Sequence, residues 1–318
     1  MRLGAIDCGT NSIRLLIAEA QPTDNGIQLK DLERQMKIVR LGKGVDATGW
    51  LAKESLERTF AATRDYAALL KEYGVKQVRF AATSATRDAG NRDIFTRGIQ
   101  DILGIEPEVI TGTEEAELSF AGALSSVGNT GETTLVVDLG GGSTEFVLGN
   151  QKGVLAARSV DIGCVRLTER HISSDPPNVS QVARVIADTD KALATALGTV
   201  DLSATQRIVG VAGTVTTVAA HALGLESYDP ARIDRADICI KDISKAAADM
   251  VAMTSAQRSK LGYMHDGRVD VIPAGSVIWA RIVERVSAMT GGAVTSALAS
   301  EKDILDGLAL SVASRAGL

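Results

Sequence analysis

The chain has 318 residues, 45% of them hydrophobic and 23% charged, so it can bury a large core, and we expect two domains. Its formal net charge of −5 gives no general attraction to nucleic acid or to anionic membranes. No apolar run has the length of a membrane span, and residues 1–20 alternate like a strand instead of a signal peptide, which indicates a cytoplasmic protein.

Cysteine and histidine usage excludes two further classes of site. The cysteines are isolated and odd in number, which argues against a disulfide framework or a zinc site: Cys8, Cys164 and Cys239. The histidines show no metal-ligand spacing, so surface or satisfied core positions are expected for them: His171, His221 and His265.

The N-terminal segment predicts a hairpin. An apolar strand ends at Asp7, a turn of small residues follows with Asn11 and Ser12, and a second apolar strand begins at Ile13. A third strand over 32–39, an amphipathic helix over 51–73 and a strand over 75–81 complete a β-β-β-α-β order.

The loop after that strand, residues 82–91, contains Arg87. It lies at the carboxyl end of a strand, where open α/β sheets bind ligands, and a guanidinium there can fork onto a phosphate. A solvated loop arginine or a capping partner fits the local sequence equally well. A helix over 91–103 and a strand over 106–110 follow.

A helix from Thr111 to about Val127 begins with three glutamates, Glu114, Glu115 and Glu117. Capping and the helix dipole explain acidic residues in a first turn. Glu114 and Glu115 point about 100° apart on a helix, so at most one of them can face a phosphate site.

The central stretch, residues 133–148, has a β-branched strand that ends at Asp138, a turn of three glycines and a serine, and a second alternating strand. Because glycines lack a Cβ, such a turn can direct several backbone N–H groups toward one anion. Asp138 and Glu145 could hold a divalent cation that bridges phosphate oxygens. A hairpin without a ligand is the alternative for this motif alone.

The N-terminal hairpin repeats the central one. The two align with Asp7 on Asp138, Gly9 on Gly140 and Ser12 on Ser143. This repeat predicts two similar half-molecules, each offering an anion-binding hairpin to a shared cleft.

The second half continues with a strand over 154–160, a long helix over 180–197 and a strand over 207–212. Gly213 and Thr214 follow that strand directly at a helix start, which makes a third candidate phosphate cradle; tight strand–helix packing is the alternative. A helix over 275–290, a strand over 293–296 and a final short helix after 300–307 end the chain.

Three motifs, DCGTNS at 7–12, DLGGGSTEF at 138–146 and GVAGT at 210–214, resemble those of the actin, sugar-kinase and heat-shock chaperone ATPase superfamily. Within it the whole chain resembles the exopolyphosphatase and guanosine-pentaphosphate phosphohydrolase family. The added markers are TGTEEA at 111–116, Arg87, GCVR at 163–166 and SEKDILDG at 300–307. The last marker departs from the family at 303–305, where a glycine or alanine with a basic residue is frequent.

The resemblance implies an α/β fold with two ribonuclease H-like (actin-like ATPase) domains facing an interdomain cleft. The first half would be 1–127, with a C-terminal helix of about 303–318 docked back on it, and the second 128–318. The chain looks like the short form, without the C-terminal helical domains of longer members.

The resemblance also implies roles. Glu115 would position and deprotonate the attacking water, Arg87 would grip the terminal phosphate, and magnesium would be bound by Asp138, Glu145 and Asp7. With the third glycine turn, the candidate phosphate-binding residues are Asn11, Ser12, Gly140, Gly141, Gly142, Ser143, Gly213 and Thr214.

We therefore expect release of orthophosphate from the end of inorganic polyphosphate by metal-assisted attack of water. Guanosine pentaphosphate presents the same terminal anhydride and stays open as a substrate. A superfamily kinase and a nucleotide-gated assembly protein are less favoured alternatives. Mg²⁺ or another divalent cation is the expected cofactor; a K⁺ requirement and a homodimer are left open, and no nucleic-acid or membrane partner is expected.

Overall fold

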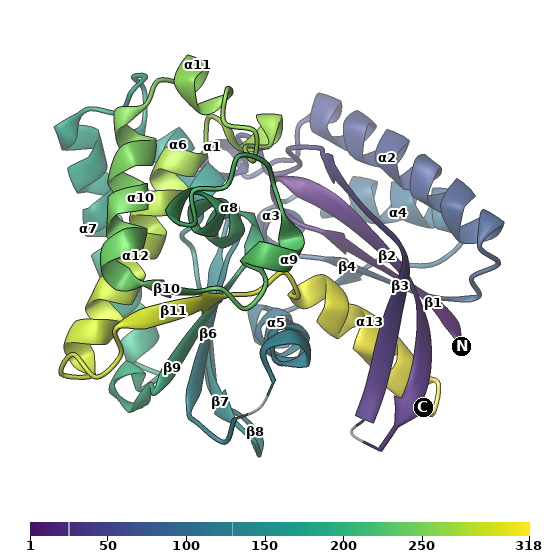
Figure 1. The fold of residues 1–318 in the computed structure, drawn as a ribbon. Helices are drawn as coiled ribbons and strands as arrows, with labels where there is room; N and C mark the ends of the chain where they lie inside the picture. Colours follow the sequence, from purple (N-terminus) through teal and green to yellow (C-terminus); the bar gives the residue numbers. More distant parts are fainter. Residues whose placement is uncertain (25, 129) are drawn as a thin grey trace. The chain divides into compact units, whose positions relative to one another are not determined.

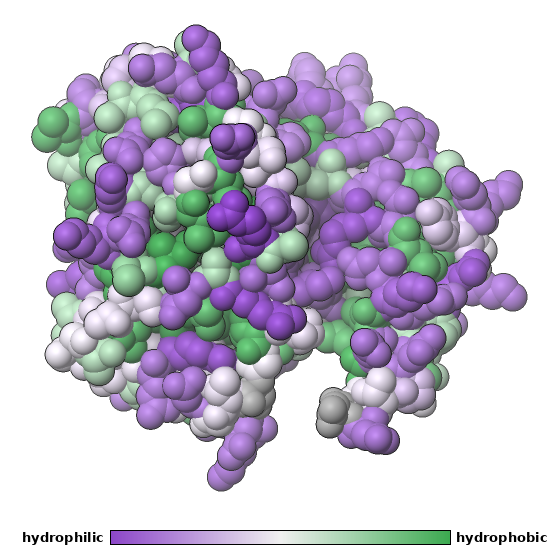
Figure 2. Space-filling model, viewed as in Figure 1, coloured by the Kyte–Doolittle hydropathy of each residue, from purple (hydrophilic) through white to green (hydrophobic). Residues whose placement is uncertain are grey.

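The computed structural model describes residues 1–24, 26–128 and 130–318 (Figure 1). The chain forms two compact units: unit 1 is Met1–Gly122 with Ile304–Leu318, and unit 2 is Ala123–Asp303. Within these described ranges, no helix combines the length and the apolar character needed to cross a membrane. Hydrophilic side chains cover most of the face shown in Figure 2, with hydrophobic side chains in patches among them.

Unit 1 contains a mixed five-stranded sheet in the order β3-β2-β1-β4-β5. The first three strands form antiparallel pairs, whereas β1, β4 and β5 run parallel. Its strands are β1 (Arg2–Cys8), β2 (Ser12–Thr23), β3 (Gly26–Ile38), β4 (Gln77–Ala82) and β5 (Glu108–Val109).

Helices cover both faces of this sheet. Side chains on both faces of its central strands are therefore buried, and the sequences of these strands are almost continuously apolar. On one face, Ile6, Ile13 and Leu15 pack with residues of α2 and α4; on the other, Ala5 and Leu16 pack with α13. The helices are α1 (Val45–Thr48), α2 (Lys53–Glu72), α3 (Ser84–Asp88), α4 (Arg92–Leu103), α5 (Gly112–Val127) and α13 (Ile304–Arg315). The boundary with unit 2 falls inside α5.

Unit 2 contains a six-stranded sheet in the order β10-β11-β9-β6-β7-β8. Read from β8, its first five strands have the order and directions of the unit 1 sheet, and β10 adds an antiparallel edge. The strands are β6 (Thr134–Leu139), β7 (Thr144–Asn150), β8 (Gly153–Val160), β9 (Arg207–Val211), β10 (Asp237–Cys239) and β11 (Ser296–Ala299). The repeat seen in the sequence is therefore a repeat of the whole sheet.

The strand predicted at 293–296 was placed too early. Gly291 and Gly292 both have positive φ, and Ala293 N donates to Thr290 O, so these residues form the turn after the preceding helix. The strand that follows the turn is Ser296–Ala299, and its residues Leu298 and Ala299 pair with the neighbouring strand Arg207–Val211.

The core of unit 2 lies between its sheet and a helical layer that includes α7, α8, α10 and α12 (Figure 1). Gly210 in β9 leaves room for the buried Trp279 of α12, since a Cβ at Gly210 would lie 2.6 Å from the indole. The helices of unit 2 are α6 (Cys164–His171), α7 (Val179–Leu197), α8 (Ala212–Ala222), α9 (Pro230–Ile233), α10 (Ile240–Ala252), α11 (Ser255–Arg258) and α12 (Ile272–Met289), with short 3₁₀ turns at Leu202–Ala204 and Asp266–Arg268.

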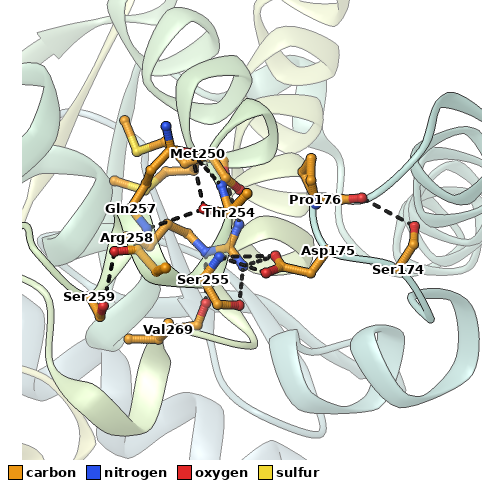
Figure 3. A network of polar contacts seen from close by, with 12 residues as sticks. Ser174, Asp175, Pro176, Met250, Thr254, Ser255, Gln257, Arg258, Ser259 and Val269 are labelled. Atoms are coloured by element: carbon orange, nitrogen blue, oxygen red, sulfur yellow. Dashed lines mark hydrogen bonds and ion pairs between the residues drawn. The ribbon is translucent and has the colours of Figure 1, made fainter.

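A buried arginine ties the helices of unit 2 to the loop before α7 (Figure 3). Arg258 is 2% exposed and donates to Val269 O at 2.8 Å, to Met250 O at 3.2 Å and to Met253 O. Its Nη2 also donates to Asp175 Oδ1 at 2.9 Å. Hydrogen bonds therefore satisfy this buried charge on several sides, as burial of a cation requires.

Candidate active site

The turn between β1 and β2 is closed by one backbone hydrogen bond, from Gly9 N to Ser12 O at 2.9 Å. Asp7, near the end of β1, is buried and lies opposite Arg14 on β2. Arg14 donates from Nε at 3.0 Å and from Nη2 at 2.7 Å to Asp7 Oδ2. In unit 1, therefore, an arginine neutralises the aspartate of the hairpin.

The turn between β6 and β7 has the same closure, from Gly140 N to Ser143 O at 3.1 Å. The predicted alignment of Gly9 with Gly140 and of Ser12 with Ser143 is thus confirmed, because equivalent residues form the hydrogen bond that closes each turn. Asp138 lies opposite Glu145 on β7, and the two are 5% and 1% exposed. In unit 2 the position that holds an arginine in unit 1 holds a second carboxylate.

The two carboxylates of unit 2 fit a divalent cation. Directly opposed residues of an antiparallel pair point to the same face with Cβ atoms about 5 Å apart. Two buried carboxylates at that separation repel each other unless a cation or a proton offsets their charge. Ser159 Oγ donates to Glu145 Oε1 at 2.7 Å and orients that side chain.

The set of carboxylates that could hold a divalent cation is small. Among the described residues, no group of three or more histidine, cysteine, aspartate or glutamate side chains gathers where it could hold a metal. Mg²⁺ commonly uses one or two carboxylates and completes its octahedron with waters and substrate phosphates. Asp7, the third ligand expected from the sequence, lies in unit 1, and its role stays a prediction.

The start of α6 fixes the glycine turn of unit 2 by hydrogen bonds to the carbonyl groups of the turn. Val165 N and Arg166 N donate to Gly141 O at 2.9 and 3.0 Å, and Arg166 Nε donates to Gly142 O at 2.7 Å. Gly163 permits this contact, because a Cβ there would lie 2.4 Å from the Gly141 carbonyl. The GCVR marker therefore has a structural role that sequence reasoning did not assign.

The N–H groups of the turn are left available to a ligand. Within the described residues, no hydrogen bond is donated by the backbone N–H of Gly141, Gly142 or Ser143. A turn whose carbonyls are engaged and whose N–H groups are open is suited to an anion.

The third glycine turn lies between β9 and α8. Ala212 has a φ of 73°, a left-handed conformation that non-glycine residues seldom adopt and that is typical of functional turns. The Arg268 guanidinium packs closely on Gly213, since a Cβ there would lie 2.4 Å from it. Arg268 Nη1 donates to Thr217 Oγ1 at 3.2 Å, and Thr214 is buried. Sequence reasoning missed Arg268 because no motif surrounds it.

In unit 1 the structure brings Glu115 and Arg87 together. Arg87, on α3 after β4, donates from Nη1 to Glu115 Oε2 at 3.0 Å and to Ile110 O at 3.1 Å. The Glu115 side chain is only 9% exposed. The residue expected to act as a base is thus a buried carboxylate held by the arginine expected to bind phosphate.

The neighbouring glutamate has a structural partner instead. Glu114 forms an ion pair with the buried Arg79, which also binds Glu108 at 2.7 Å and donates to Ser311 Oγ of α13 at 2.8 Å. The bond from Arg79 outweighs partial burial and lowers the pKa of Glu108. The two adjacent glutamates therefore point to different arginines, Glu114 to Arg79 and Glu115 to Arg87, as the helical spacing predicts.

The remaining candidates lie in the first hairpin turn. Asn11 O accepts from Val39 N at 3.0 Å and from Arg40 N at 2.8 Å, and Ser12 pairs with Ile38 of β3. Unit 1 thus holds Asn11, Ser12, Arg87 and Glu115, and unit 2 holds the glycine turns and the carboxylate pair. A shared cleft between them stays a prediction.

Comparison with known proteins identifies the family. Residues 17–312 match the family model described as Ppx/GppA phosphatase family. The chain belongs to this family. Among Ppx/GppA relatives, exopolyphosphatase 2 of Mycobacterium tuberculosis is 46% identical over 317 residues, covering 98% of each chain. The family resemblance inferred from the sequence is confirmed.

Solved Ppx/GppA structures show the same fold. The crystal structure of an exopolyphosphatase-like protein has 42% identity and a TM-score of 0.94, covering 99% of this chain and 100% of that one. The Aquifex aeolicus family member has 30% identity and a TM-score of 0.79, covering 100% and 99%. The predicted α/β fold with two ribonuclease H-like domains is confirmed by these likenesses and by the repeated sheet order.

Proposed function

We propose that this Ppx/GppA phosphatase is an exopolyphosphatase, which hydrolyses the terminal phosphoanhydride bond of inorganic polyphosphate and releases orthophosphate. The observation that carries the proposal is the buried Glu115 carboxylate bonded to Arg87. The 46% identity to a protein named exopolyphosphatase supports the choice of substrate. We also propose, from the sequence, a cytoplasmic enzyme that can form a homodimer.

The phosphate end is bound mainly by fixed donors. The N–H groups of Gly141 and Gly142 and the hydroxyl of Ser143 would cradle phosphate oxygens, and α6 keeps the turn rigid from behind. Asp138 and Glu145 would hold the divalent cation, Mg²⁺ by preference, whose charge offsets that of the phosphate oxygens when bound. Asn11 and Ser12 would add donors from the first hairpin.

Glu115 would accept the proton of the attacking water at a carboxylate oxygen. Its Oε2 accepts a hydrogen bond from Arg87, which fixes the side chain in one orientation, and the fixed carboxylate would align a water molecule. Arg87 would at the same time contact the terminal phosphate and offset charge that develops in the transition state. Burial around Glu115 limits access of bulk water, so few competing orientations of the nucleophile exist.

The first test is Glu115→Gln, which preserves shape and removes the base. We expect phosphate release from long-chain polyphosphate to fall by about 100-fold or more. Glu117→Gln on the same helix is the matched control, because Glu117 is exposed, and it should keep parental activity. Equal rates for parent and Glu115→Gln would contradict the assignment of the base.

The same assay separates the alternatives. A kinase would need an acceptor, so phosphate release from polyphosphate in its absence favours the hydrolase. Guanosine pentaphosphate presents the same terminal bond, and comparing kcat/KM for it and for polyphosphate identifies the preferred substrate. Assembly that depends on nucleotide in a sedimentation experiment would favour the nucleotide-gated class instead.

A further inference from the structure

A polar pocket of about 280 Å³ lies at the β8 edge of unit 2, beside the candidate phosphate turn. Its walls come from the end of β8 and from α6 and α7. Two bonds connect it to the candidate site: Ser159 Oγ donates to Glu145 Oε1 at 2.7 Å, and Thr144 Oγ1 donates to Ile162 O at 2.8 Å. The pocket and the turn thus lie at the same end of the sheet.

Acidic side chains do not dominate this pocket. Asp188 on α7 is already neutralised, since Arg170 Nη1 lies 2.9 Å and His171 Nε2 lies 2.8 Å from its Oδ2. Asp161 is the other carboxylate in the lining, and it is exposed. The acidic charge left to oppose an anion is therefore that of Asp161.

Two cations of the lining have no carboxylate partner. Arg158 on β8 and Lys191 on α7 are exposed, and neither forms an ion pair with any residue that the structure describes. Together they outweigh Asp161, so the pocket is locally positive on a chain whose formal net charge is −5. A concave site with excess positive charge concentrates anions, and the effect is screened by salt.

The lining also indicates the class of anion. None of the described residues that line the pocket is aromatic, so it offers no stacking surface for a nucleobase. It lies at the same end of the sheet as the phosphate turn, since its lining residue Ile162 accepts a hydrogen bond from Thr144, the first residue of β7 after the turn. Its volume is larger than a single phosphate ion requires.

We propose that this pocket binds phosphates of the polyphosphate chain that lie farther from the cleaved end, so that long chains bind more tightly than short ones. The inference rests on the proposed function, because it takes polyphosphate as the substrate. Arg158 and Lys191 are specificity-determining residues in this scheme. They contact the substrate away from the reacting atoms and contribute binding without contributing to chemistry.

The test is the double variant Arg158→Ala/Lys191→Ala in the full chain. The matched control is Arg64→Ala/Lys245→Ala, which removes the same charges from exposed positions outside the pocket. We expect KM for long-chain polyphosphate to rise about five- to tenfold in the pocket variant, with kcat and the KM for tripolyphosphate unchanged. Added salt should reduce the difference from the parent.

A binding measurement makes the inference independent of turnover. In a Glu115→Gln background, calorimetric titration of long-chain polyphosphate should show weaker binding for the pocket variant than for the control, even if polyphosphate is not hydrolysed by the parent. Unchanged long-chain affinity, or an equal loss for tripolyphosphate, would overturn the proposal. Loss of binding of inorganic phosphate alone, with no dependence on chain length, would also overturn it, because the pocket would then be an orthophosphate site.

Discussion

Arg14 and Glu145 occupy equivalent positions in the two hairpins and carry opposite charges. Arg14 neutralises Asp7 within unit 1, whereas Glu145 adds a second negative charge beside Asp138. This one position therefore decides which hairpin carries two opposed carboxylates. This difference is visible in the sequence, but its meaning depends on the cross-strand register that the structure supplies.

Glu145→Gln tests with two measurements whether Asp138 and Glu145 bind a cation. Removing one of the two proposed ligands should raise the magnesium concentration needed for half-maximal phosphate release by at least about tenfold. In a chelator, the same variant should melt at a higher temperature than the parent, because the repulsion between two buried carboxylates is gone. Ser159→Ala, which removes only an orienting hydroxyl, should show a smaller change. If Glu145→Gln melts at a lower temperature than the parent in a chelator and keeps the magnesium dependence of the parent, Asp138 and Glu145 are not a cation site.

Asp175 makes stability depend on pH. The backbone bond from Ser255 and the ion pair with Arg258 lower its pKa. Since the folded pKa lies below the unfolded value of about 3.9, the stabilisation is complete above that value and is lost as the pH falls through the folded pKa. Asp175→Asn should therefore lower the melting temperature at neutral pH, and the difference from the parent should shrink below about pH 4. Asp266→Asn, at an exposed position, is the control for removal of one carboxylate.

At the scale of elements, α13 is packed directly on the helix that carries Glu115. A Cβ at Gly307 would lie 1.9 Å from Leu118 O, so the two backbones are in contact. Arg79 links the same helices through Glu114 and Ser311. The SEKDILDG segment, which contains Gly307, therefore packs on the helix that carries Glu115.

Gly307→Ala should destabilise this junction. Forcing a methyl group into the contact should cost about 1–3 kcal/mol of unfolding free energy and should also lower kcat, because α5 must shift. Urea unfolding and initial rates measure the two effects. Gly198→Ala is the control, since a Cβ there would meet only Thr195 O at 3.4 Å. Parental stability and kcat in Gly307→Ala would contradict the packing role.

Sequence patterns predicted the helices and strands better than the side chains that contact the glycine turns. The hairpins and the long helices follow from periodicity and motifs, because those signals are local. The choice of Glu115 over Glu114 came from the family resemblance, and it stays a prediction. The short helix α3 and the edge strand β10 were not predicted, since few residues define them. Arg166 and Arg268 were not recognised as supports of the glycine turns, because their contacts come from distant parts of the chain.

The two units of the molecule contain sheets with the same order of five strands, and each unit adds different elements to its sheet. Unit 2 carries the extra strand β10 and a larger set of helices, and its residues are continuous in the chain. Unit 1 is discontinuous, because α13 returns to it after all of unit 2. The proposed reaction needs residues of both units, since Glu115 belongs to unit 1 and the glycine turn of residues 140–143 belongs to unit 2.

This discontinuity has a consequence during translation. The ribosome must make residues 123–303 before it reaches the helix that covers the second face of the first sheet. The later-made unit can complete its core first, which reverses the usual order of folding from the N-terminus. Until then Leu3, Ala5 and Leu16 lack their covering helix, and the nascent chain carries an apolar surface open to chaperones.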